Sequence, residues 1–221
     1  SAVGVGANEV AEALATQDGV TVLRNGSRGM LWAEPLVEVV TDRGRVGYPN
    51  VTTEDLPTLI EAGMLTGEDV GGCIGVVEDF EWFARQHRVS YVRVGVIEPT
   101  NIASYAEHGG WVGLTRALAM EPADVVEEVV DSGLRGRGGA GFPTGIKWRT
   151  VLGAESDVKF VCCNLDEGDS VTFADRILTE GDPFTLVEAM IITAHAVRAR
   201  EGYVYVRSEY PDAIATLRRA I

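Results

Sequence analysis

The chain has 221 residues, of which 46% are hydrophobic, so it is long enough for one large domain or two small ones with a buried core. Its 33 acidic and 19 basic side chains leave a formal net charge of -14, which excludes a basic nucleic-acid-binding surface and suits either solubility or the docking of a basic partner subunit. With three cysteines in no metal-ligand spacing, no apolar run of roughly 20 residues and no signal peptide, the sequence predicts a cytoplasmic protein without a membrane span.

The N-terminal part, residues 1–66, is predicted to form a small α/β unit. A turn at Asp42–Gly44 joins the last two of its strands, and Gly63 ends its closing helix, for which Thr53 is the candidate cap. Residues 67–94 lack a regular pattern and are expected to be a connector. The expected elements are a helix at Asn8–Ala15, strands at Val20–Arg24, Leu36–Thr41 and Gly44–Tyr48, and a helix at Thr53–Ala62.

The second part, residues 95–221, is predicted to combine helices with short strands, so the fold class is α/β. Pro122 suits a first helical turn, and the valines that follow it share one helical face. Because the chain stops inside its last helix, we expect it to be part of a longer protein. The expected elements are helices at Trp111–Met120, Pro122–Asp131 and Thr144–Leu152, a buried strand at Lys159–Cys163, a loop at Asn164–Asp175, a helix from Pro183 to about Arg200, a strand at Tyr203–Arg207 and a helix from Pro211.

A glycine-rich segment, GLRGRGGAGFPTGIKW, spans Gly133–Trp148. It contains the spacing G-x-G-x-x-G, but it follows a predicted helix, whereas a Rossmann fingerprint follows a strand. Such a density of glycine favours close approach of the backbone to a ligand, and exposed amides at the start of a helix suit a phosphate. The glycines concerned are Gly133, Gly136, Gly138, Gly139, Gly141 and Gly145.

Other side chains of this segment strengthen the ligand hypothesis. Arg135, Arg137 and Lys147 add cationic donors, and Phe142 offers a flat face on which a purine or flavin can stack. Glycine content alone is equally typical of a flexible, solvated loop, which therefore stays open as the alternative.

An acidic loop, Asn164–Asp169, follows directly on the expected strand at Lys159–Cys163. Ligands of open α/β sheets bind at strand ends, where an amide and three carboxylates can hydrogen-bond the hydroxyls of a ribityl or ribose chain. A solvated turn and a divalent-cation site are the alternatives, although the spacing of the acids matches no EF-hand.

The cysteines and histidines indicate no catalytic constellation. Cys162 and Cys163 are adjacent in the expected strand and point to opposite faces, where burial as small hydrophobes is the expected role. Nothing in the sequence pairs His87, His108 or His195 with a nucleophile, so all three are expected to be structural or surface residues.

Four segments in fixed order resemble the flavoprotein subunit of respiratory complex I (its 51-kDa, NADH-binding subunit) and its relatives. They are the glycine-rich segment, the acidic loop, TFADRILTEGDPF at Thr172–Phe184 and GYVYVRSEYP at Gly202–Pro211. Within this family, DEGDS followed by TFADR, and RNGSRGMLWAEPLVEVV near the N-terminus, look most like the beta (diaphorase) subunit of NAD-dependent molybdenum- or tungsten-containing formate dehydrogenase. The diaphorase subunit of NAD-reducing hydrogenases is the nearest competitor.

The resemblance implies FMN held without covalent attachment, with NAD(H) stacked above its ring. It implies that the glycine-rich segment lines the FMN phosphate and ribityl side, through Gly136, Arg137, Gly138, Gly139 and Lys147. It also implies that Asn164 and Asp166 contact the ribityl chain and flavin edge. Phe142 would stack on the adenine, and Glu167 and Asp169 would face the nicotinamide region.

Two positions depart from the family pattern. Relatives often carry glutamate where Asp169 stands and tend to have glycine where Val171 stands. Because a β-branched residue resists positive φ, we expect the turn at Val171 to differ from that of the relatives.

The resemblance also bears on the domains. Residues 1–66 look like the end of a thioredoxin-like domain in which a cysteine pair that binds a 2Fe-2S cluster is replaced by Ser27 and Leu31, so this domain is expected to be cluster-free and to serve as a docking scaffold. Residues 95–221 correspond to the first part of the FMN-binding domain. The rest of that domain, and a helical domain with a 4Fe-4S cluster, would lie beyond residue 221.

The function implied by the resemblance is hydride exchange between NAD(H) and FMN, coupled to one-electron transfer with iron-sulfur clusters. The expected partners are the molybdenum/tungsten catalytic (alpha) subunit of formate dehydrogenase and a small thioredoxin-like 2Fe-2S (gamma) subunit. A hydrogenase diaphorase or complex I subunit is the alternative within the enzyme class. A non-catalytic scaffold fragment is the alternative outside it.

Overall fold

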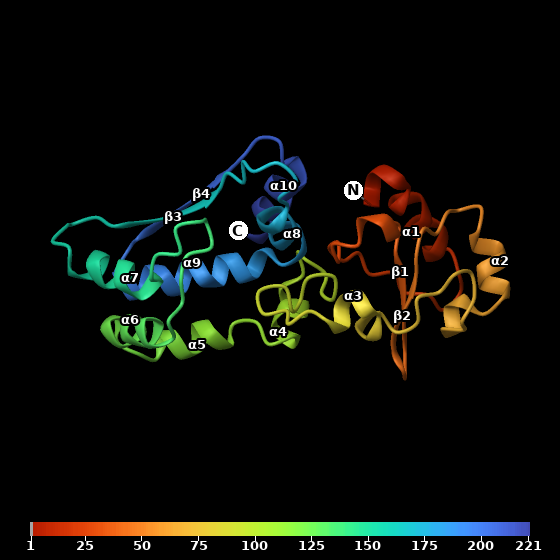
Figure 1. The fold of residues 1–221 in the computed structure, drawn as a ribbon, viewed down its shortest axis with the longest axis horizontal. Helices are drawn as coiled ribbons and strands as arrows, with labels where there is room; N and C mark the ends of the chain where they lie inside the picture. The colour runs from red at the N-terminus through yellow and green to blue at the C-terminus, as the bar shows by residue number, and fades with distance from the viewer. Residues whose placement is uncertain (1) are drawn as a thin grey trace. The chain divides into compact units, whose positions relative to one another are not determined.

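The computed structural model describes residues 2–221, which fall into two compact units, Ser1–Gly95 and Val96–Ile221 (Figure 1). Each unit is a mixture of helices and one two-stranded sheet, so the α/β class is confirmed. No described helix is both long and apolar enough to cross a membrane.

The N-terminal unit is built around an antiparallel hairpin. Val37 pairs with Tyr48 and Thr41 with Gly44, so the predicted turn at residues 42–43 is confirmed. The regular elements are helix α1 (Ala7–Ala15), strands β1 (Val37–Thr41) and β2 (Gly44–Tyr48), helices α2 (Leu56–Glu61) and α3 (Glu81–Ala84), and short 3-10 helices at Ala2–Val5, Leu31–Ala33, Met64–Thr66 and Val77–Asp79.

Two hydrophobic clusters stabilise this unit. The first joins α1 to β2 and to α2, through Val10, Leu14, Val46, Tyr48, Val51, Leu56 and Met64. The second joins Met30 and Ala33 to Val77 and Phe83, all of them buried. The stretch 67–94, expected to be a connector, therefore supplies core side chains to this unit. Burial of such side chains is the main source of stability for a unit of this size.

Two details of the N-terminal unit differ from the sequence prediction. Val20–Arg24 is not a strand, because the hairpin is the whole sheet of this unit among the described residues and offers this segment no partner. Helix α2 starts at Leu56 and not at Thr53, because hydrogen bonds between Thr52 and Asp55 hold a turn just before it. The Thr52 amide and hydroxyl donate to the Asp55 carboxylate, and the Asp55 amide donates to the Thr52 hydroxyl. Gly63, with φ of 98°, does end the helix, as predicted.

The C-terminal unit consists of a helical layer and a parallel pair of strands. Two consecutive helices connect the strands along the chain, and the longer of these helices contacts both strands. The elements are helices α4 (Ile102–Glu107), α5 (Val112–Leu118), α6 (Pro122–Asp131) and α7 (Thr144–Gly153), strand β3 (Phe160–Leu165), helices α8 (Ala174–Gly181) and α9 (Pro183–Val197), strand β4 (Glu201–Val206) and helix α10 (Pro211–Ala220).

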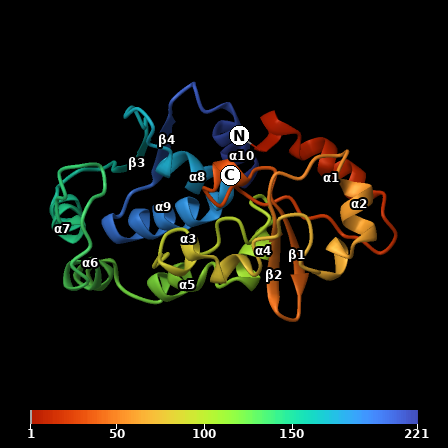
Figure 2. The ribbon, with the colours of Figure 1, turned by 45° about the vertical axis from the view of Figure 1, so that its right-hand side comes forward.

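Helix α9 lies along the unit between the strands and the pair α5 and α6, as Figures 1 and 2 both show. Its N-terminus is capped by Asp182, whose carboxylate accepts the Thr185 amide hydrogen at 3.2 Å. The buried Glu188 in its middle accepts the Trp111 and Leu114 amides at 2.9 Å each and so fixes the start of α5. The predicted valine face of α6 is confirmed, with Val125 and Val126 buried in a cluster that includes Ala196 of α9.

The strand β3 was expected to be buried, and this is wrong. Its side chains alternate, with Leu165 buried but Phe160, Cys162 and Asn164 exposed, because helix α9 covers only one face of the two-stranded sheet. Cys162 is therefore exposed and not a core residue. Helices α4 and α8 were not predicted at all.

Candidate functional site

The glycine-rich loop between α6 and α7 is closed at its base by two backbone hydrogen bonds. Thr144 donates to the Leu134 carbonyl at 2.8 Å, and Gly136 donates to the Phe142 carbonyl at 2.9 Å. Inside the loop, the Arg135 guanidinium donates to the Gly141 carbonyl at 2.6 Å. These bonds give the loop a defined shape, which distinguishes it from the open, flexible loop that glycine content alone would allow.

The glycines of this segment serve two purposes. Gly139 and Gly141 have φ of 109° and 60°, which L-residues rarely adopt, and a Cβ added at Gly138, Gly139 or Gly141 would meet nothing within 4 Å. These residues thus leave open space above the backbone. At Gly145 a Cβ would lie 2.5 Å from the Val130 backbone nitrogen, so this glycine lets α7 pack closely on α6.

The tip of the loop presents donors for an anion. The amides of residues 137–142 donate no hydrogen bond to any atom of residues 2–221. Arg137 and Lys147 are both exposed, and Lys147 lies in the first turn of α7, where the helix dipole adds positive potential. Successive free amides with nearby cations form the kind of cradle that binds phosphate. Phe142, 56% exposed, offers its ring beside them.

The acidic loop begins at the carboxyl end of β3. The Asn164 side-chain oxygen accepts the Asp166 amide hydrogen at 2.9 Å, which turns the chain at the end of the strand. Asn164, Asp166 and Asp169 are all exposed. Their oxygens lie at the strand end as acceptors for hydroxyl groups, the kind of partner that the sequence indicated for this loop.

Glu167 differs from its neighbours because it is only 9% exposed. Its carboxylate accepts the Asp175 and Arg176 amide hydrogens at 3.0 and 3.3 Å and the Tyr210 hydroxyl at 3.2 Å. Burial, followed by the nearby Glu167 charge, raises the pKa of both Asp175 and Tyr210. The structure thus places this carboxylate against protein groups, whereas the family pattern directed it to the nicotinamide.

Val171 adopts φ of 60°, so its β-branched side chain does not keep this turn out of the positive-φ region. The side chain is 89% exposed and meets no crowding that would forbid the conformation. A β-branched residue in this region carries strain of about 1–2 kcal/mol. Valine thus occupies a backbone conformation that usually favours glycine.

The structure brings both predicted groups of site residues into the unit Val96–Ile221, but it leaves them as two separate loops. One loop lies between α6 and α7, and the other follows β3 (Figure 1). Between residues 133–147 and 164–169 there is no hydrogen bond or ion pair within the described chain. A ligand that contacts both loops must therefore bridge them, because no protein interaction joins them directly.

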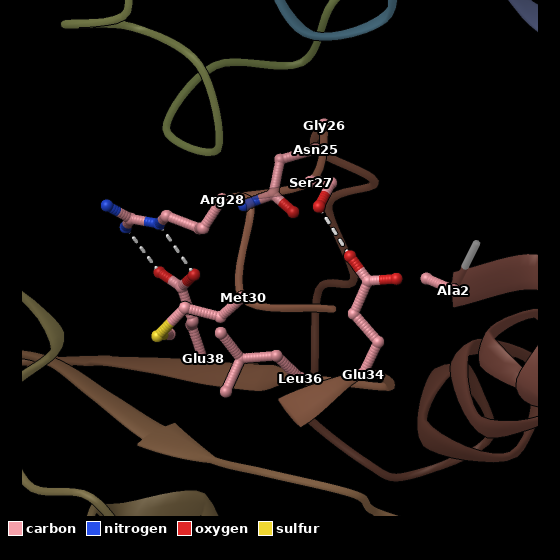
Figure 3. Close-up of a pocket in the computed structure, with 9 residues that line it drawn as sticks. All are labelled: Ala2, Asn25, Gly26, Ser27, Arg28, Met30, Glu34, Leu36 and Glu38. Atoms are coloured by element: carbon pink, nitrogen blue, oxygen red, sulfur yellow. Dashed lines mark hydrogen bonds and ion pairs between the residues drawn. The ribbon is translucent and has the colours of Figure 1, made fainter. Parts of the chain in front are cut away.

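The N-terminal unit has a small cavity of about 60 Å³, shown in Figure 3. Its walls include the buried Arg28–Glu38 ion pair, with a nitrogen–oxygen distance of 2.6 Å, and Ser27, whose hydroxyl donates to Glu34. Drug-sized ligands occupy pockets of roughly 300 Å³ or more, so this cavity is too small for a flavin or a dinucleotide. Ser27, which the resemblance placed at a cysteine position of cluster-bearing relatives, donates its hydroxyl hydrogen to a protein carboxylate.

No sequence pattern predicted the residues that support the acidic loop. Tyr210 and Arg207 lie in the GYVYVRSEYP segment, to which no individual role was assigned. Arg207 donates to the Glu167 carbonyl, and its guanidinium carbon lies 5.1 Å from the centre of the Tyr210 ring. The available signal was an arginine at the end of a predicted strand and a tyrosine three residues later. This pattern is too common to identify the contacts with Glu167, which lies 40 and 43 residues away in sequence.

Residues 129–221, which include both loops, match the family model described as the Nuo51 FMN-binding domain. The matched segment makes up less than half of the 221 residues, and over this segment the chain is similar to FMN-binding domains of this family. The match covers the glycine-rich segment, the acidic loop, the helix pair α8–α9 and the last strand and helix. The loop of free amides at residues 137–142 therefore lies inside the matched segment.

Individual relatives carry similar sequences in this region. The chain is 51% identical over 137 residues to the NADP-reducing hydrogenase subunit HndC of Solidesulfovibrio fructosivorans, an alignment that covers 62% of this chain and 28% of that protein. It is 47% identical over 121 residues to an NADH-quinone oxidoreductase subunit of Rhizobium meliloti, covering 54% and 29%. The chain thus spans less than a third of the length of these relatives.

Two further comparisons concern hydrogenases that reduce NAD. The alpha subunit of the NAD-reducing hydrogenase HoxS of Cupriavidus necator is 50% identical over 97 residues, covering 44% of this chain and 16% of that protein. A crystal structure of NAD+-reducing [NiFe]-hydrogenase in the air-oxidized state aligns with 99% of this chain and 37% of its own, at 27% identity and a TM-score of 0.49. The similarity over residues 129–221 is established by the sequence matches and not by this structural alignment.

Proposed function

We propose that this chain is the flavin-binding part of a diaphorase subunit, which passes electrons between NAD(H) and iron-sulfur centres through FMN. The observation that carries the proposal is the loop of free amides at residues 137–142, flanked by two exposed cations, inside a segment that matches an FMN-binding domain. Phosphate needs several donors and positive charge at one place, and this loop supplies both.

The residues of the acidic loop fit the remainder of the cofactor. FMN carries a chain of hydroxyl groups between its phosphate and its ring, and hydroxyl donors need acceptors. Asn164, Asp166 and Asp169 present exposed oxygens at the end of β3 for this purpose. The exposed Phe142 ring would stack on the adenine of NAD(H), and Gly136, Gly138 and Gly139 would allow close approach of the backbone to the phosphate.

When bound, FMN supplies the chemistry that accepts a hydride from NADH and exchanges single electrons with iron-sulfur clusters. The chain itself binds and orients both nucleotides, and Arg137 and Lys147 neutralise the phosphate. No side chain has to transfer a proton to the reacting atoms, which agrees with the scattered placement of the histidines: His108 bonds the Ser104 carbonyl and His195 the Met120 carbonyl.

As the electron donor we propose formate, oxidised by a partner subunit that contains molybdenum or tungsten. The support is the amino-acid sequence of residues 24–40 and 166–176, which resembles that of the beta subunit of formate dehydrogenase. A small 2Fe-2S subunit would complete the assembly, and a 4Fe-4S cluster outside these 221 residues would pass the electrons from formate to the flavin. The N-terminal unit would act as a cluster-free, thioredoxin-like docking scaffold.

A hydrogenase or complex I assembly is the second candidate, favoured by a specific observation. The sequence relatives are named as subunits of an NADP-reducing hydrogenase, an NAD-reducing hydrogenase and NADH-quinone oxidoreductase. In that case the partner subunits would oxidise hydrogen, or reduce a quinone, instead of oxidising formate. The two nucleotide loops would serve the same purpose in each assembly.

Reduction of the natural complex by different donors tests the assignment. The complex is purified anaerobically, and its flavin absorbance is followed after formate, or hydrogen, is added without NADH. Bleaching by formate and not by hydrogen is the expected result. Bleaching by hydrogen alone would replace the formate assignment with the hydrogenase one. A complex that lacks flavin would leave this chain as a scaffold and contradict the proposed function.

A further inference from the structure

Two tryptophans are in contact on the surface of the N-terminal unit. Trp32 belongs to the 3-10 helix Leu31–Ala33 and Trp82 to α3, and their ring centroids lie 4.9 Å apart in a T-shaped arrangement. They are 56% and 47% exposed. Tryptophan is highly buried on average, because its ring removes a large apolar area from water. This unit thus leaves a pair of rings open to solvent that its own folding does not cover.

The hydrophobic core beneath explains the position of the pair. Ala33 and Phe83, the residues that follow Trp32 and Trp82, are both buried in the same hydrophobic cluster. Each short helix therefore directs one side chain inward and leaves the preceding tryptophan outside. Because the pair lies on a packed base, little conformational entropy is lost when another protein covers it.

The exposed charge next to α3 is mainly negative. Glu78, Asp79 and Glu81 are all exposed, and the arginine that Glu78 contacts is buried and already bound to a second glutamate. Arg85 forms an ion pair with Glu81 that is open to water on both sides, and such pairs contribute little. Arg88 is half-buried against an aromatic ring. Carboxylates without strong partners of their own therefore border the tryptophans.

The chemistry of this surface selects among possible occupants. Indole faces and carboxylates both attract cations. A second copy of the chain would bring the same carboxylates together, and a nucleic acid or an anionic lipid surface would be repelled by them. A protein segment with lysine or arginine beside an apolar residue suits both features, since the long stems of these side chains also cover apolar surface.

We propose that the tryptophan pair and the bordering carboxylates form a docking surface for a basic segment of another polypeptide, in which lysine or arginine flanks an aliphatic or aromatic side chain. The inference rests on the docking role proposed for the N-terminal unit, and it gives that role a surface and a partner chemistry. It does not depend on nucleotide binding, because the surface lies outside the matched residues 129–221.

Photo-cross-linking in the natural complex tests the partner directly. p-Benzoylphenylalanine replaces Trp82 in one preparation and Val40, an exposed residue of β1, in the control. Irradiation is expected to join the probe at Trp82 to a different polypeptide, at a peptide that carries lysine or arginine. A cross-link within the same polypeptide, to a second copy or to a peptide without basic residues would overturn the proposal, as would no more product than at Val40.

Affinity measurements separate the aromatic and the charged parts of the surface. The dissociation constant between the subunit that contains this chain and the rest of the complex is measured by dilution. Trp32→Ala and Trp82→Ala are each expected to raise it roughly tenfold or more, as for central aromatic residues of interfaces. The double variant Asp79→Asn/Glu81→Gln is expected to raise it several-fold at about 50 mM salt and to have no effect at about 500 mM, because salt screens exposed charges.

The double variant Asp18→Asn/Glu54→Gln is the matched control, since it removes the same two kinds of charge from exposed positions outside residues 78–85. It is expected to leave the dissociation constant unchanged at both salt concentrations. Equal weakening by both double variants would make net charge the cause and overturn the proposal. An unchanged dissociation constant in either tryptophan variant would overturn it as well.

Folding and nucleotide chemistry are distinguished from docking. If a tryptophan variant fails to fold, the exposed charge variants still decide the outcome, and the absence of salt-dependent weakening in Asp79→Asn/Glu81→Gln overturns the proposal. Reduction of bound flavin by NADH is expected to be the same in every variant. If NADH fails to reduce the flavin even in the unchanged complex, the proposed nucleotide function fails, while the cross-link still tests the docking surface.

Discussion

Arg137 and Lys147 are the exposed cations beside the free amides of the glycine-rich loop, and they provide a direct test of phosphate binding. Changing both to glutamine in the natural complex is expected to weaken FMN binding by tenfold or more, since hydrogen bonds to charged groups contribute roughly 1.5–3 kcal/mol each. Riboflavin, which lacks the phosphate, is expected to bind with little change. Affinities are measured by titrating flavin fluorescence after the cofactor is removed.

Arg149 supplies the control for this experiment. It lies on the same helix as Lys147 but is paired with Glu127 at 2.5 Å. Arg149→Gln is expected to leave the affinities for FMN and riboflavin unchanged. If the double glutamine variant weakened riboflavin as much as FMN, the loop would not be the phosphate site.

The adjacent cysteines Cys162 and Cys163 are expected to differ in reactivity. Burial raises the pKa of the Cys163 thiol to about 11, with smaller contributions from Asp175 and Cys162, whereas Cys162 is exposed. Because the thiolate is the reactive form, iodoacetamide at about pH 8 should modify Cys162 and spare Cys163 until the pH approaches the raised pKa. Peptide mass spectrometry after brief labelling checks this. Equal labelling of both residues would contradict the placement of β3.

At the residue scale, the sequence predicted which side chains form the two loops but not what each one does. Glu167 belongs to a run of acids that look equivalent in sequence, and only the positions of α8 and Tyr210 show that it is enclosed. Gly145 likewise resembles the other glycines of its segment in sequence, but a glycine is needed there because the backbone of α6 packs against it. Such roles depend on contacts between distant segments, which local patterns do not contain.

At the scale of elements, the packing of α7 on α6 depends on Gly145. Gly145→Ala would place a methyl group 2.5 Å from the Val130 backbone nitrogen, and backbone cannot move aside as a side chain can. We expect a loss of about 1–3 kcal/mol in the free energy of unfolding, as for other overpacked sites. Denaturant unfolding of the 221-residue chain measures it.

Gly153, at the end of the same helix, is the matched control. A Cβ there meets nothing within 4 Å, so Gly153→Ala is expected to be neutral or to stabilise the helix by up to about 1 kcal/mol. If both alanine variants behaved alike, close packing would not explain the glycine at position 145.

Elements with a local signal were predicted well, and those that depend on tertiary contacts were not. The amphipathic pattern and proline of α6 and the prolines at the start of α9 and α10 marked these helices correctly. Helix α8 was missed because its cap comes from Glu167 and not from an adjacent residue. The strand expected at Val20–Arg24 failed because strand formation needs a partner, which its β-rich composition cannot guarantee.

At the scale of the whole molecule, we propose that the two units have separate tasks. Both nucleotide loops belong to Val96–Ile221, while the cavity described in Ser1–Gly95 measures only about 60 Å³. The division into a docking unit and a nucleotide unit is a proposal, for which the family match supplies support over residues 129–221. The pattern of expected helices and strands predicted the α/β class, which the structure confirms.

The proposed function requires that this chain brings NADH to FMN. An anaerobic titration of the purified natural complex with NADH, followed by flavin absorbance, tests it most directly. We expect bound FMN whose absorbance falls as NADH is added, because the hydride reduces the flavin before electrons pass to the iron-sulfur centres. A complex that contains no FMN, or FMN that NADH does not bleach, would contradict the claim.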